Sequence, residues 1–330
     1  MRPIVAAPCR ASHGGDRPYF GTVAMTTDAS PPLQRAESLR AFKIRAVIVH
    51  LACLGVFFVP LTSTVLWTAV ALYFVRVFSW EAGSHRYFSH RSFKTSRTFQ
   101  FILALLAALS GQRGVIWWAT HHRAHHKYSD VSPLDQHSPR FHSLWHAHFG
   151  WLLSQRALDT DLTQARDLAR FPELVWLNKY HYLFPLGLLI ATFCVGQYTA
   201  FFGATGLGAS AVVWTFFVSM VLSQQAAFLL NTGLHGVEPG WFRYRRFATQ
   251  DATTNAWLLA IPILGGAFHN NHHRYMNSAR SGFYWYELDL TYLVLKILSW
   301  LRVVWDLVPV PQDVLDEGRK SKGHALPGNP

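Results

Sequence analysis

The chain has 330 residues, of which half are hydrophobic and only 15% are charged, and its formal net charge is +12. Soluble globular proteins carry about 25% charged residues, so this composition does not suit an ordinary water-exposed surface, and it excludes a disordered or collagen-like chain. Three cysteines give no disulfide framework. A mean hydropathy of +0.12 indicates that one part of the chain lies in a membrane and another part does not.

Apolar residues form two long blocks. No Asp, Glu, Lys or Arg occurs from Ala46 to Val75, or between Lys179 and Glu238. A spanning helix needs about 20 residues, so the second block holds two helices. The first block, with its flanks, fits a hairpin that turns at 60–64. We therefore predict an all-α integral membrane protein with four transmembrane helices in two hairpins, at about 41–60, 63–82, 182–202 and 208–230.

The basic residues predict the orientation of these helices. The short tips near 60–64 and 202–208 contain no Lys or Arg, whereas the N-terminal arm and the segments 83–180 and 231–330 hold most of them. Positively charged loops stay in the cytosol. We therefore expect a multi-pass protein of a bacterial inner membrane, with both termini and both long segments cytoplasmic. Anionic lipid head groups suit the basic residues, and no nucleic-acid partner is expected.

The two ends of the chain have a different composition from the middle. Residues 1–40 are rich in Ala, Gly, Pro, Ser and Arg without periodicity, and they predict a disordered basic arm. The arm has no apolar signal-peptide core, and Met25 is an alternative start to Met1. The tail, 313–330, is also expected to be disordered, which leaves 41–312 as one domain.

Histidine points to the chemistry, because 15 of the 18 histidines fall between His85 and His273. His85 and His90 form an H-x-x-x-x-H pair. Two H-x-x-H-H boxes follow, and their histidines are His122, His125 and His126, then His269, His272 and His273. On an α-helix, the three imidazoles of an H-x-x-H-H box share one face. Such a face is suited to binding a metal ion.

The H-x-x-x-x-H pair fits an α-helix less well. Five residues correspond to about 500° of rotation, which leaves the two side chains about 140° apart. Both reach one metal only if the helix ends or bends there; otherwise they serve different metals. Eight histidines exceed the closed four-ligand set of zinc, and imidazole also suits iron, copper and nickel. The number of ligands favours two metal ions, and such clusters are not typical of heme.

The order of these boxes around two hydrophobic hairpins resembles the membrane fatty acid desaturase family, within it the stearoyl-CoA (Δ9) type and its bacterial relatives. The stretches that carry the likeness are 83–91 (GSHRYFSHR), 117–130 (WWATHHRAHHKYSD), 148–151 (HFGW), 231–235 (NTGLH), 268–273 (FHNNHH) and 285–291 (WYELDLT). The likeness covers about residues 41–312. The chain departs from the family at 265–267, where Gly-Gly-Ala replaces Gly-Glu-Gly, and at Thr232, where serine is usual.

The resemblance implies a cytosolic helical cap with a di-iron centre held by the eight box histidines and a ninth, His235. It implies that Asn231 reaches iron through a water. Tyr73 is a candidate for closing an acyl tunnel, with ordinary packing as the alternative. The implied cofactors are two Fe²⁺ ions, with O2 as co-substrate. Removing hydrogen from an unactivated methylene requires a strong oxidant, which is the chemical reason for iron and O2.

The implied enzyme is an oxidoreductase of the acyl-CoA desaturase type. It introduces a cis double bond, at Δ9, into a saturated chain carried by CoA or a membrane lipid. Acidic side chains should orient the imidazoles through the second ring nitrogen. The candidates for this role are Glu81, Asp130, Asp135 and Asp251, with helix caps or surface ion pairs as the alternative. Five other histidines near the boxes are expected to lie outside the ligand set: His121, His137, His142, His146 and His148.

The sequence shows no iron–sulfur motif, dinucleotide-binding fingerprint or fused cytochrome b5 segment. Electrons are therefore expected from a separate ferredoxin or cytochrome b5-like carrier with a reductase, and an acidic carrier suits the basic face. Two other functions remain open. One is a fatty acyl hydroxylase or oxygenase on the same histidine scaffold. The other is a histidine-rich membrane metal transporter, which is disfavoured because the histidines lie at helix ends rather than along the spans.

Overall fold

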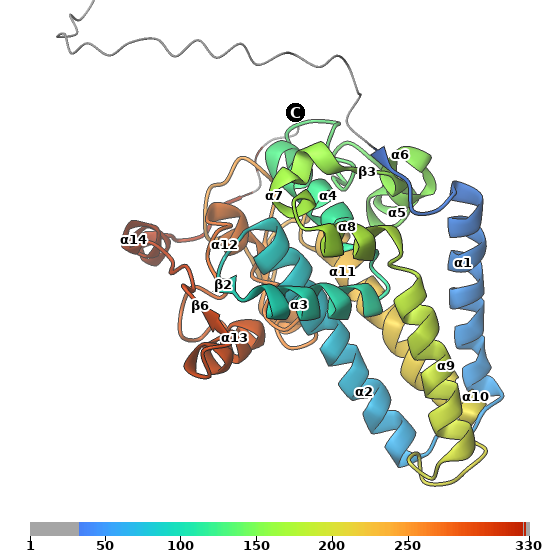
Figure 1. Cartoon of the computed structure of the whole chain (residues 1–330). Coiled ribbons are helices and arrows are strands. Elements are labelled where there is room, and N and C mark those ends of the chain that lie inside the picture. Colours follow the sequence, from blue (N-terminus) through green and yellow to red (C-terminus); the bar gives the residue numbers. More distant parts are fainter. Residues whose placement is uncertain (1–32, 326, 328–330) are drawn as a thin grey trace, which may run out of the picture. The chain divides into compact units, whose positions relative to one another are not determined.

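The computed structural model describes residues 33–325 and 327, and this part of the chain is mostly helical (Figure 1). Its strands are two-residue segments that pair antiparallel. The pairs are β1 (Leu33–Gln34) with β3 (Thr160–Asp161), β2 (Lys94–Thr95) with β6 (Val304–Trp305), and β4 (Arg243–Tyr244) with β5 (Asn255–Ala256). These short ladders join segments that are far apart in sequence, and helices make the rest of the architecture.

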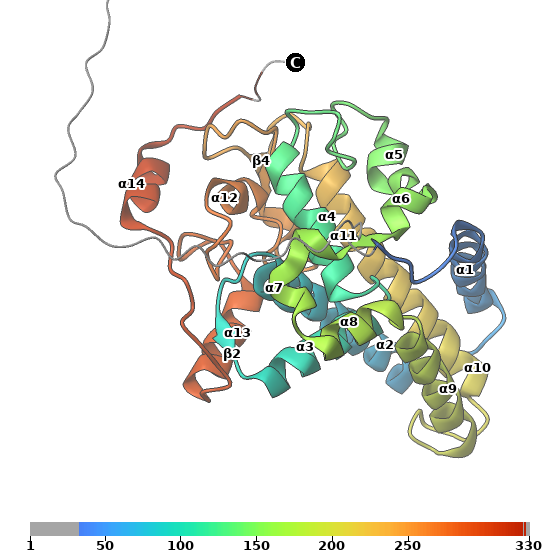
Figure 2. The same cartoon turned by 45° about the horizontal axis from the view of Figure 1, so that its top comes forward.

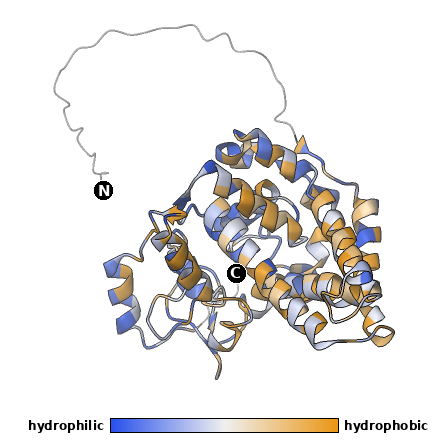
Figure 3. Ribbon diagram, turned by 60° about the horizontal axis from the view of Figure 1, so that its bottom comes forward, coloured by the Kyte–Doolittle hydropathy of each residue, from blue (hydrophilic) through white to orange (hydrophobic). Residues whose placement is uncertain are grey.

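The most apolar helices pack against one another as a bundle, in the lower part of Figure 1. Its elements are α1 (Leu39–Ala52) with the 3-10 segment η1 (Cys53–Phe57), α2 (Ser63–Phe78), α9 (Leu183–Tyr198), and the continuous run of α10 (Gly208–Ala211), η5 (Val212–Val218) and α11 (Ser219–Gly233). Ser38 and Thr62 begin α1 and α2 as N-caps, because their side-chain oxygens accept backbone N–H groups. Most residues of these helices are hydrophobic and are drawn in orange in Figure 3.

Two helices in the described part of the chain are long and apolar enough to cross a membrane, Ser63–Ser89 and Gly208–Gly233. They match the spans predicted at 63–82 and 208–230. The regions predicted as spans at 41–60 and 182–202 are also helical, but α9 has only 16 residues and α1 gives way to η1 after Ala52. The structure therefore shows a mostly helical protein in which two apolar helices are long enough to span a membrane.

Shorter helices surround the upper end of the bundle in Figures 1 and 2. They are α3 (Arg97–Leu109), α4 (Val115–Tyr128), α5 (Leu144–His148), η3 (Gly150–Leu153), α6 (Gln155–Leu158), η4 (Leu162–Ala165), α7 (Arg166–Ala169), α8 (Pro172–Lys179), η6 (Trp257–Leu259), α12 (His269–Arg274), α13 (Leu290–Trp300) and α14 (Gln312–Lys320). The largest apolar core lies here, where Phe88, Leu103, Ile116 and Leu174 are buried together. This core fixes α3, α4 and α8 against the end of the α2 helix.

The structure corrects both predicted ends of the domain. Residues 1–32 of the predicted arm lie outside the described residues, but Leu33–Gln34 pairs with β3 and α1 already begins at Leu39. At the other end, α14 replaces the first part of the predicted disordered tail. Val314 of α14 is buried, and the Tyr284 hydroxyl donates to the carbonyl of Leu315. A short polar helix with so few apolar residues gives a weak sequence signal.

Candidate metal centre

Nine histidines converge in two clusters, and within each cluster the nitrogen atoms lie within 4.8 Å of one another. The five-histidine cluster contains His85, His90, His122, His126 and His272. The four-histidine cluster contains His125, His235, His269 and His273. The clusters are neighbours, since the rings of His126 and His273 stack with centroids 4.3 Å apart. These nine residues are the nine predicted metal ligands.

Each H-x-x-H-H box serves both clusters. On α4, the i and i+4 residues His122 and His126 belong to the five-histidine cluster, and His125 between them belongs to the other. On α12, the assignment is reversed, because His269 and His273 join the four-histidine cluster and His272 joins the five-histidine cluster. The sequence alone could not divide the ligands in this way.

The H-x-x-x-x-H pair lies on a π-helix. After Phe78 the α2 helix continues as η2 (Ser79–Ser89), and the His90 N–H donates to the His85 carbonyl at 3.3 Å. This i to i+5 bond is the repeat of a π-helix. Five residues then return the side chain to the same side, and the two rings lie 5.0 Å apart. The spacing left open a helix that ends or bends, or two different metals; the structure shows a change of helix type that brings both histidines into one cluster.

His235 reaches its cluster from the chain that follows α11. The helix ends at Gly233, and a β-bridge pairs His235 with Thr253. The Asp130 carboxylate accepts from His235 Nδ1 at 2.7 Å and from the Ala252 N–H at 2.9 Å. One buried carboxylate therefore joins the end of α4, the segment after α11 and the strand region near Thr253.

The four predicted acidic partners all contact cluster histidines through Nδ1. Glu81 accepts from His85 at 3.2 Å, Asp135 from His125 at 2.9 Å, Asp130 from His235 at 2.7 Å and Asp251 from His273 at 2.9 Å. A carboxylate that accepts a hydrogen bond from Nδ1 keeps the imidazole proton on Nδ1. The lone pair of Nε2 is then free to bind a metal. The prediction that these residues orient imidazoles is confirmed at the level of contacts.

Burial and facing charges shift the pKa values of several clustered histidines and of a carboxylate that contacts them. Burial and neighbouring imidazoles lower the pKa of His122, His126, His269 and His272 well below its usual range. Burial alone would raise the pKa of Asp130, but the facing His235 and its hydrogen bonds lower it to about 2. Metal binding requires neutral imidazoles, and the lowered pKa values of these four histidines favour that form. The Asp130 carboxylate instead raises the pKa of His235, although burial lowers it.

The distances between donor atoms fit metal ions. The Nε2 atoms of His85 and His272 are 2.9 Å apart, those of His122 and His126 3.0 Å, and those of His235 and His269 2.9 Å. Two nitrogens bound at right angles to one ion, at about 2.1 Å, lie about 3 Å apart. His273 Nε2 is buried without a hydrogen-bond partner. An all-imidazole donor set of this kind suits first-row transition metals.

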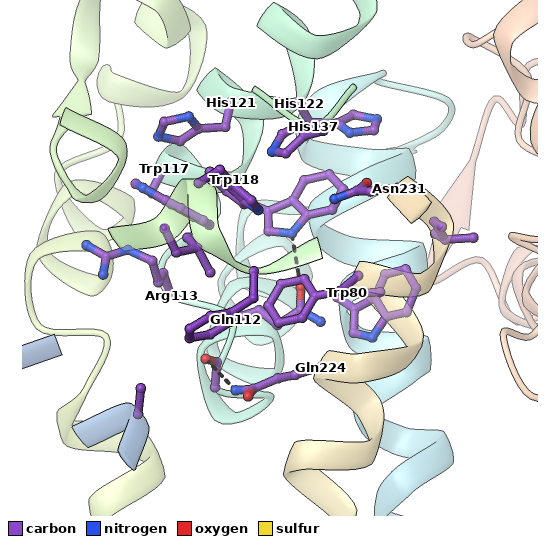
Figure 4. A pocket seen from close by; sticks show the side chains of 18 of the residues that line it. Trp80, Gln112, Arg113, Trp117, Trp118, His121, His122, His137, Gln224 and Asn231 are labelled. Carbon is purple, nitrogen blue, oxygen red and sulfur yellow. Dashed lines mark hydrogen bonds between the residues drawn. The ribbon is translucent and has the colours of Figure 1, made fainter. Parts of the chain in front are cut away.

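A cavity beside the clusters provides room for a substrate. Its lining includes four cluster histidines and the side chains of Trp80, Trp117, Trp118, Met220 and Phe228. Figure 4 shows Asn231 pointing toward this space from α11, near His122 and His137. The Trp118 indole donates to Gln112 at 3.2 Å, and the Gln224 amide donates to the Gly111 carbonyl at 3.0 Å. The structure therefore brings Asn231 beside the predicted ligands.

Tyr73 does not line this cavity. Its hydroxyl donates to the Pro262 carbonyl at 2.8 Å and its ring packs on Phe74, so the packing alternative describes it better than tunnel closure. At the end of the cavity away from the clusters lie Gly111, Met220 and Gln224, which the sequence reasoning missed. No spacing rule identifies them, because they come from a loop and a long apolar helix.

Among the described residues, the other histidines near the boxes lie outside the two clusters. His148 contacts the hydroxyl of Thr232 at 3.0 Å and the side chain of Gln225 at 2.8 Å. His137 lies near Asp135, at 3.9 Å, and His121 lines the cavity. His137 also forms a group with His125 and Asp135 whose donor atoms lie within 4.8 Å of one another, so its place outside the ligand set stays a prediction.

A model of the family described as fatty acid desaturase matches residues 61–298. The chain belongs to the fatty acid desaturase family. Members of this family are oxidoreductases that act on acyl chains, so this desaturase is an enzyme of lipid metabolism. The resemblance of its histidine boxes is thereby confirmed.

Individual relatives of the desaturase act on acyl groups with different carriers. It is 32% identical to the hex-5-enoyl-[acyl-carrier protein] acetylenase of Moorena producens, over 79% of this chain and 82% of that protein. It is 29% identical to the sn-1 stearoyl-lipid 9-desaturase of Synechocystis sp., over 90% and 88% of the two chains. It is 30% identical to an acyl-CoA 5-desaturase of Anemone leveillei, over 81% and 78%.

Proposed function

We propose that this desaturase introduces a cis double bond, at the Δ9 position, into a saturated fatty acyl chain at a di-iron centre. The observation that carries the proposal is the pair of buried histidine clusters beside a largely apolar cavity. Iron supplies, with O2, the oxidising power that an unactivated methylene requires. The 9-desaturases among the relatives support the Δ9 position.

The nine cluster histidines are the proposed ligands. Five would hold one ion and four the other, and Asn231 would contact a metal through a water. The imidazole-only donor set and the carboxylates on Nδ1 support this assignment. The carboxylates hold the rings in place, and the tryptophans around the cavity keep bulk water from the acyl chain.

The reaction balances with one O2 for each double bond. Two C–H bonds of adjacent methylenes break and a C=C bond forms, while O2, two electrons and two protons yield two waters. The two electrons come from a separate carrier, a ferredoxin or a cytochrome b5-like protein, with a reductase. The cavity walls choose the carbons by position, since a displacement of 1 Å costs about 100-fold in rate.

We also propose that all four helical regions cross a bacterial inner membrane and that the histidine cap faces the cytosol. Exposed apolar side chains on α1 and α9 support this, because Ile48, Leu51, Leu186 and Ile190 expose about half or more of their surface. The basic segments 83–180 and 231–330 support the cytosolic side.

The test is lipid analysis of a desaturase-deficient host that expresses the chain. Gas chromatography with double-bond derivatisation should report a new cis-monoene, with its position. The product should disappear in the double variant His125→Ala, His126→Ala, which removes a ligand from each cluster. The control His146→Ala changes a histidine outside both clusters and should keep the product. Hydroxylated chains would instead show an acyl hydroxylase, and no new lipid from iron-loaded protein with donor and reductase would refute the proposal.

A further inference from the structure

The cavity beside the histidine clusters lies between two helices of the bundle. On α1 its lining runs from Phe42 to His50, and on α11 from Met220 to Asn231. Eight and eleven residues of α-helix correspond to about 12 and 16 Å. The cavity is therefore elongated along the bundle, with the clusters at its upper end.

The wall on the α1 side contains the opening. Of the described residues that line the cavity, only His50 is exposed, while Arg45, Ala46 and Val49 are half-buried. The residues that line the cavity near the histidine clusters and on α11 are buried or half-buried. The ring of Phe149 borders the opening, since it contacts the rings of both Phe42 and His50. The cavity thus opens to the outside of the protein along α1.

This opening lies within apolar surface. The opposite face of α1 exposes 51% of Ile44, 58% of Val47 and 56% of Ile48. His50 lies five residues, or about 7 Å along the helix, beyond Arg45, the last charged residue before the uncharged run that ends at Val75.

The lower end of α1 also packs against a helix of spanning length. The segment η1 lies on η5, and Gly55 approaches Val213 so closely that a Cβ at Gly55 would lie 2.7 Å from a Val213 methyl. Since η5 belongs to the apolar helix Gly208–Gly233, which is long enough to cross a membrane, the proposed membrane spans would place the opening beside hydrocarbon and not beside water. A water-soluble thioester would have to bring its charged carrier to this depth.

We propose that the acyl chain enters sideways from the bilayer, through the opening along α1 at Ala46, Val49 and His50. The substrate is accordingly an acyl chain esterified to a membrane lipid, rather than an acyl-CoA or an acyl-carrier protein. The exposed Lys43 and Arg40, one and two turns above, suit the anionic head groups at the membrane surface. This inference rests on the proposed desaturase activity and specifies its substrate class.

The experiment uses the full-length, iron-loaded enzyme in nanodiscs with electron donor and reductase. Deuterated stearoyl chains are supplied in one arm as phospholipid or glycolipid of the nanodisc, and in other arms as stearoyl-CoA or stearoyl-carrier protein. The inference predicts deuterated monoene in the lipid arm, at least about tenfold more than in either thioester arm. Conversion of a thioester but not of the lipid would overturn the inference and leave the desaturase function standing. No conversion in any arm would overturn both.

A pair of variants tests the route. Ala46→Trp fills the opening from inside the cavity and should lower lipid conversion about tenfold or more. Val47→Trp places the same bulk on the opposite face of α1 and should leave conversion unchanged. The iron content of both variants, equal to that of the wild type, establishes that they are folded. Equal conversion by the two iron-loaded variants would contradict the route.

A depth measurement tests the location without relying on turnover. After replacement of Cys9, Cys53 and Cys194, a spin label is placed at His50→Cys or, as the control, at Arg40→Cys. Power saturation should show the label at position 50 accessible to O2 and shielded from a polar nickel complex, and the label at position 40 the reverse. Accessibility of position 50 to the nickel complex would place the opening in water and overturn the inference.

Discussion

The two histidine clusters differ in what surrounds them. In the five-histidine cluster, Glu81 is the one carboxylate within ion-pair distance of a ring, among the residues that the structure describes, and it is shared with Arg86. In the four-histidine cluster, Asp130, Asp135 and Asp251 each hold one ring. One site therefore has more imidazoles, and the other has more negative charge.

This difference indicates that the two sites are not equivalent. Three carboxylates near four imidazole ligands stabilise a higher positive charge than one carboxylate that is already paired with an arginine. The five-histidine site is instead positioned by backbone geometry, through the π-helix η2 and its buried ion pairs. The predictions below separate these two ways of holding a metal.

Removal of one ligand from each site should give the largest effect. His272→Ala takes an imidazole from the five-histidine cluster, and His269→Ala takes one from the four-histidine cluster on the same short helix. Each variant should lose one of two iron ions, and both should lose detectable product, because the proposed reaction needs both sites. Elemental analysis and lipid chromatography measure the two effects. Full activity of either variant would show that its cluster is not part of the centre.

Loss of a supporting carboxylate should have an intermediate effect. Asp130→Asn removes the charge beside His235 and weakens the contact that joins it to Ala252. Removing such a partner typically lowers metal affinity or activity about 10- to 100-fold. Iron retention during dialysis against a chelator measures the change. Glu81→Gln is the matched variant at the other site, and an equal or larger loss there would contradict the proposed difference in charge.

The five-histidine site should also be sensitive to packing at a distance. Gly265 has φ +99°, and a Cβ there would lie 2.6 Å from Asp289 Cα. Asp289 holds Arg86, which in turn holds Glu81. We expect Gly265→Ala to lower the free energy of unfolding by about 3 kcal/mol or more, against about 1 kcal/mol for a positive φ alone.

Gly203→Ala is the control for this effect, because Gly203 has φ +103° with no atom within 4 Å of the added methyl. Thermal unfolding in detergent compares the two variants. Equal shifts in the unfolding temperature of the two variants would mean that the contact with Asp289 does not affect stability.

The smallest effect is expected at Tyr73. Tyr73→Phe removes a hydrogen bond to the Pro262 carbonyl and should cost about 1 kcal/mol of stability. Because Tyr73 lies outside the cavity lining, the chain length and double-bond position of the product should not change. A shifted product profile would return Tyr73 to the substrate tunnel.

The sequence predicted the helical class and all nine clustered histidines, because box spacing and apolar runs are local signals. It also identified Asp130 and Asp251 as partners of histidines, although His235 and Asp130 are 105 residues apart. The division of each box between two clusters could not be predicted, since it depends on how α4 and α12 face each other. The π-helix at His85 could not be predicted either, because the spacing left open whether the helix ends or bends there or whether the two histidines serve different metals.

The C-terminal helix and one end of the cavity were predicted less well. α14 is short and has few apolar residues, so the burial of Val314 gave no clear signal in the sequence. The end of the cavity at Gly111 and Met220 arises from a loop that meets a distant helix. Such contacts depend on tertiary packing, which has no period along the chain.

The most direct test of the central claim is the metal content of the purified chain, measured together with turnover. Elemental analysis of the wild-type protein should give two iron ions per chain, and addition of O2, donor and reductase should convert a saturated acyl chain into a cis-monoene. A single metal per chain, or exchangeable zinc or copper without acyl conversion, would contradict the di-iron desaturase and favour a metal-transport function.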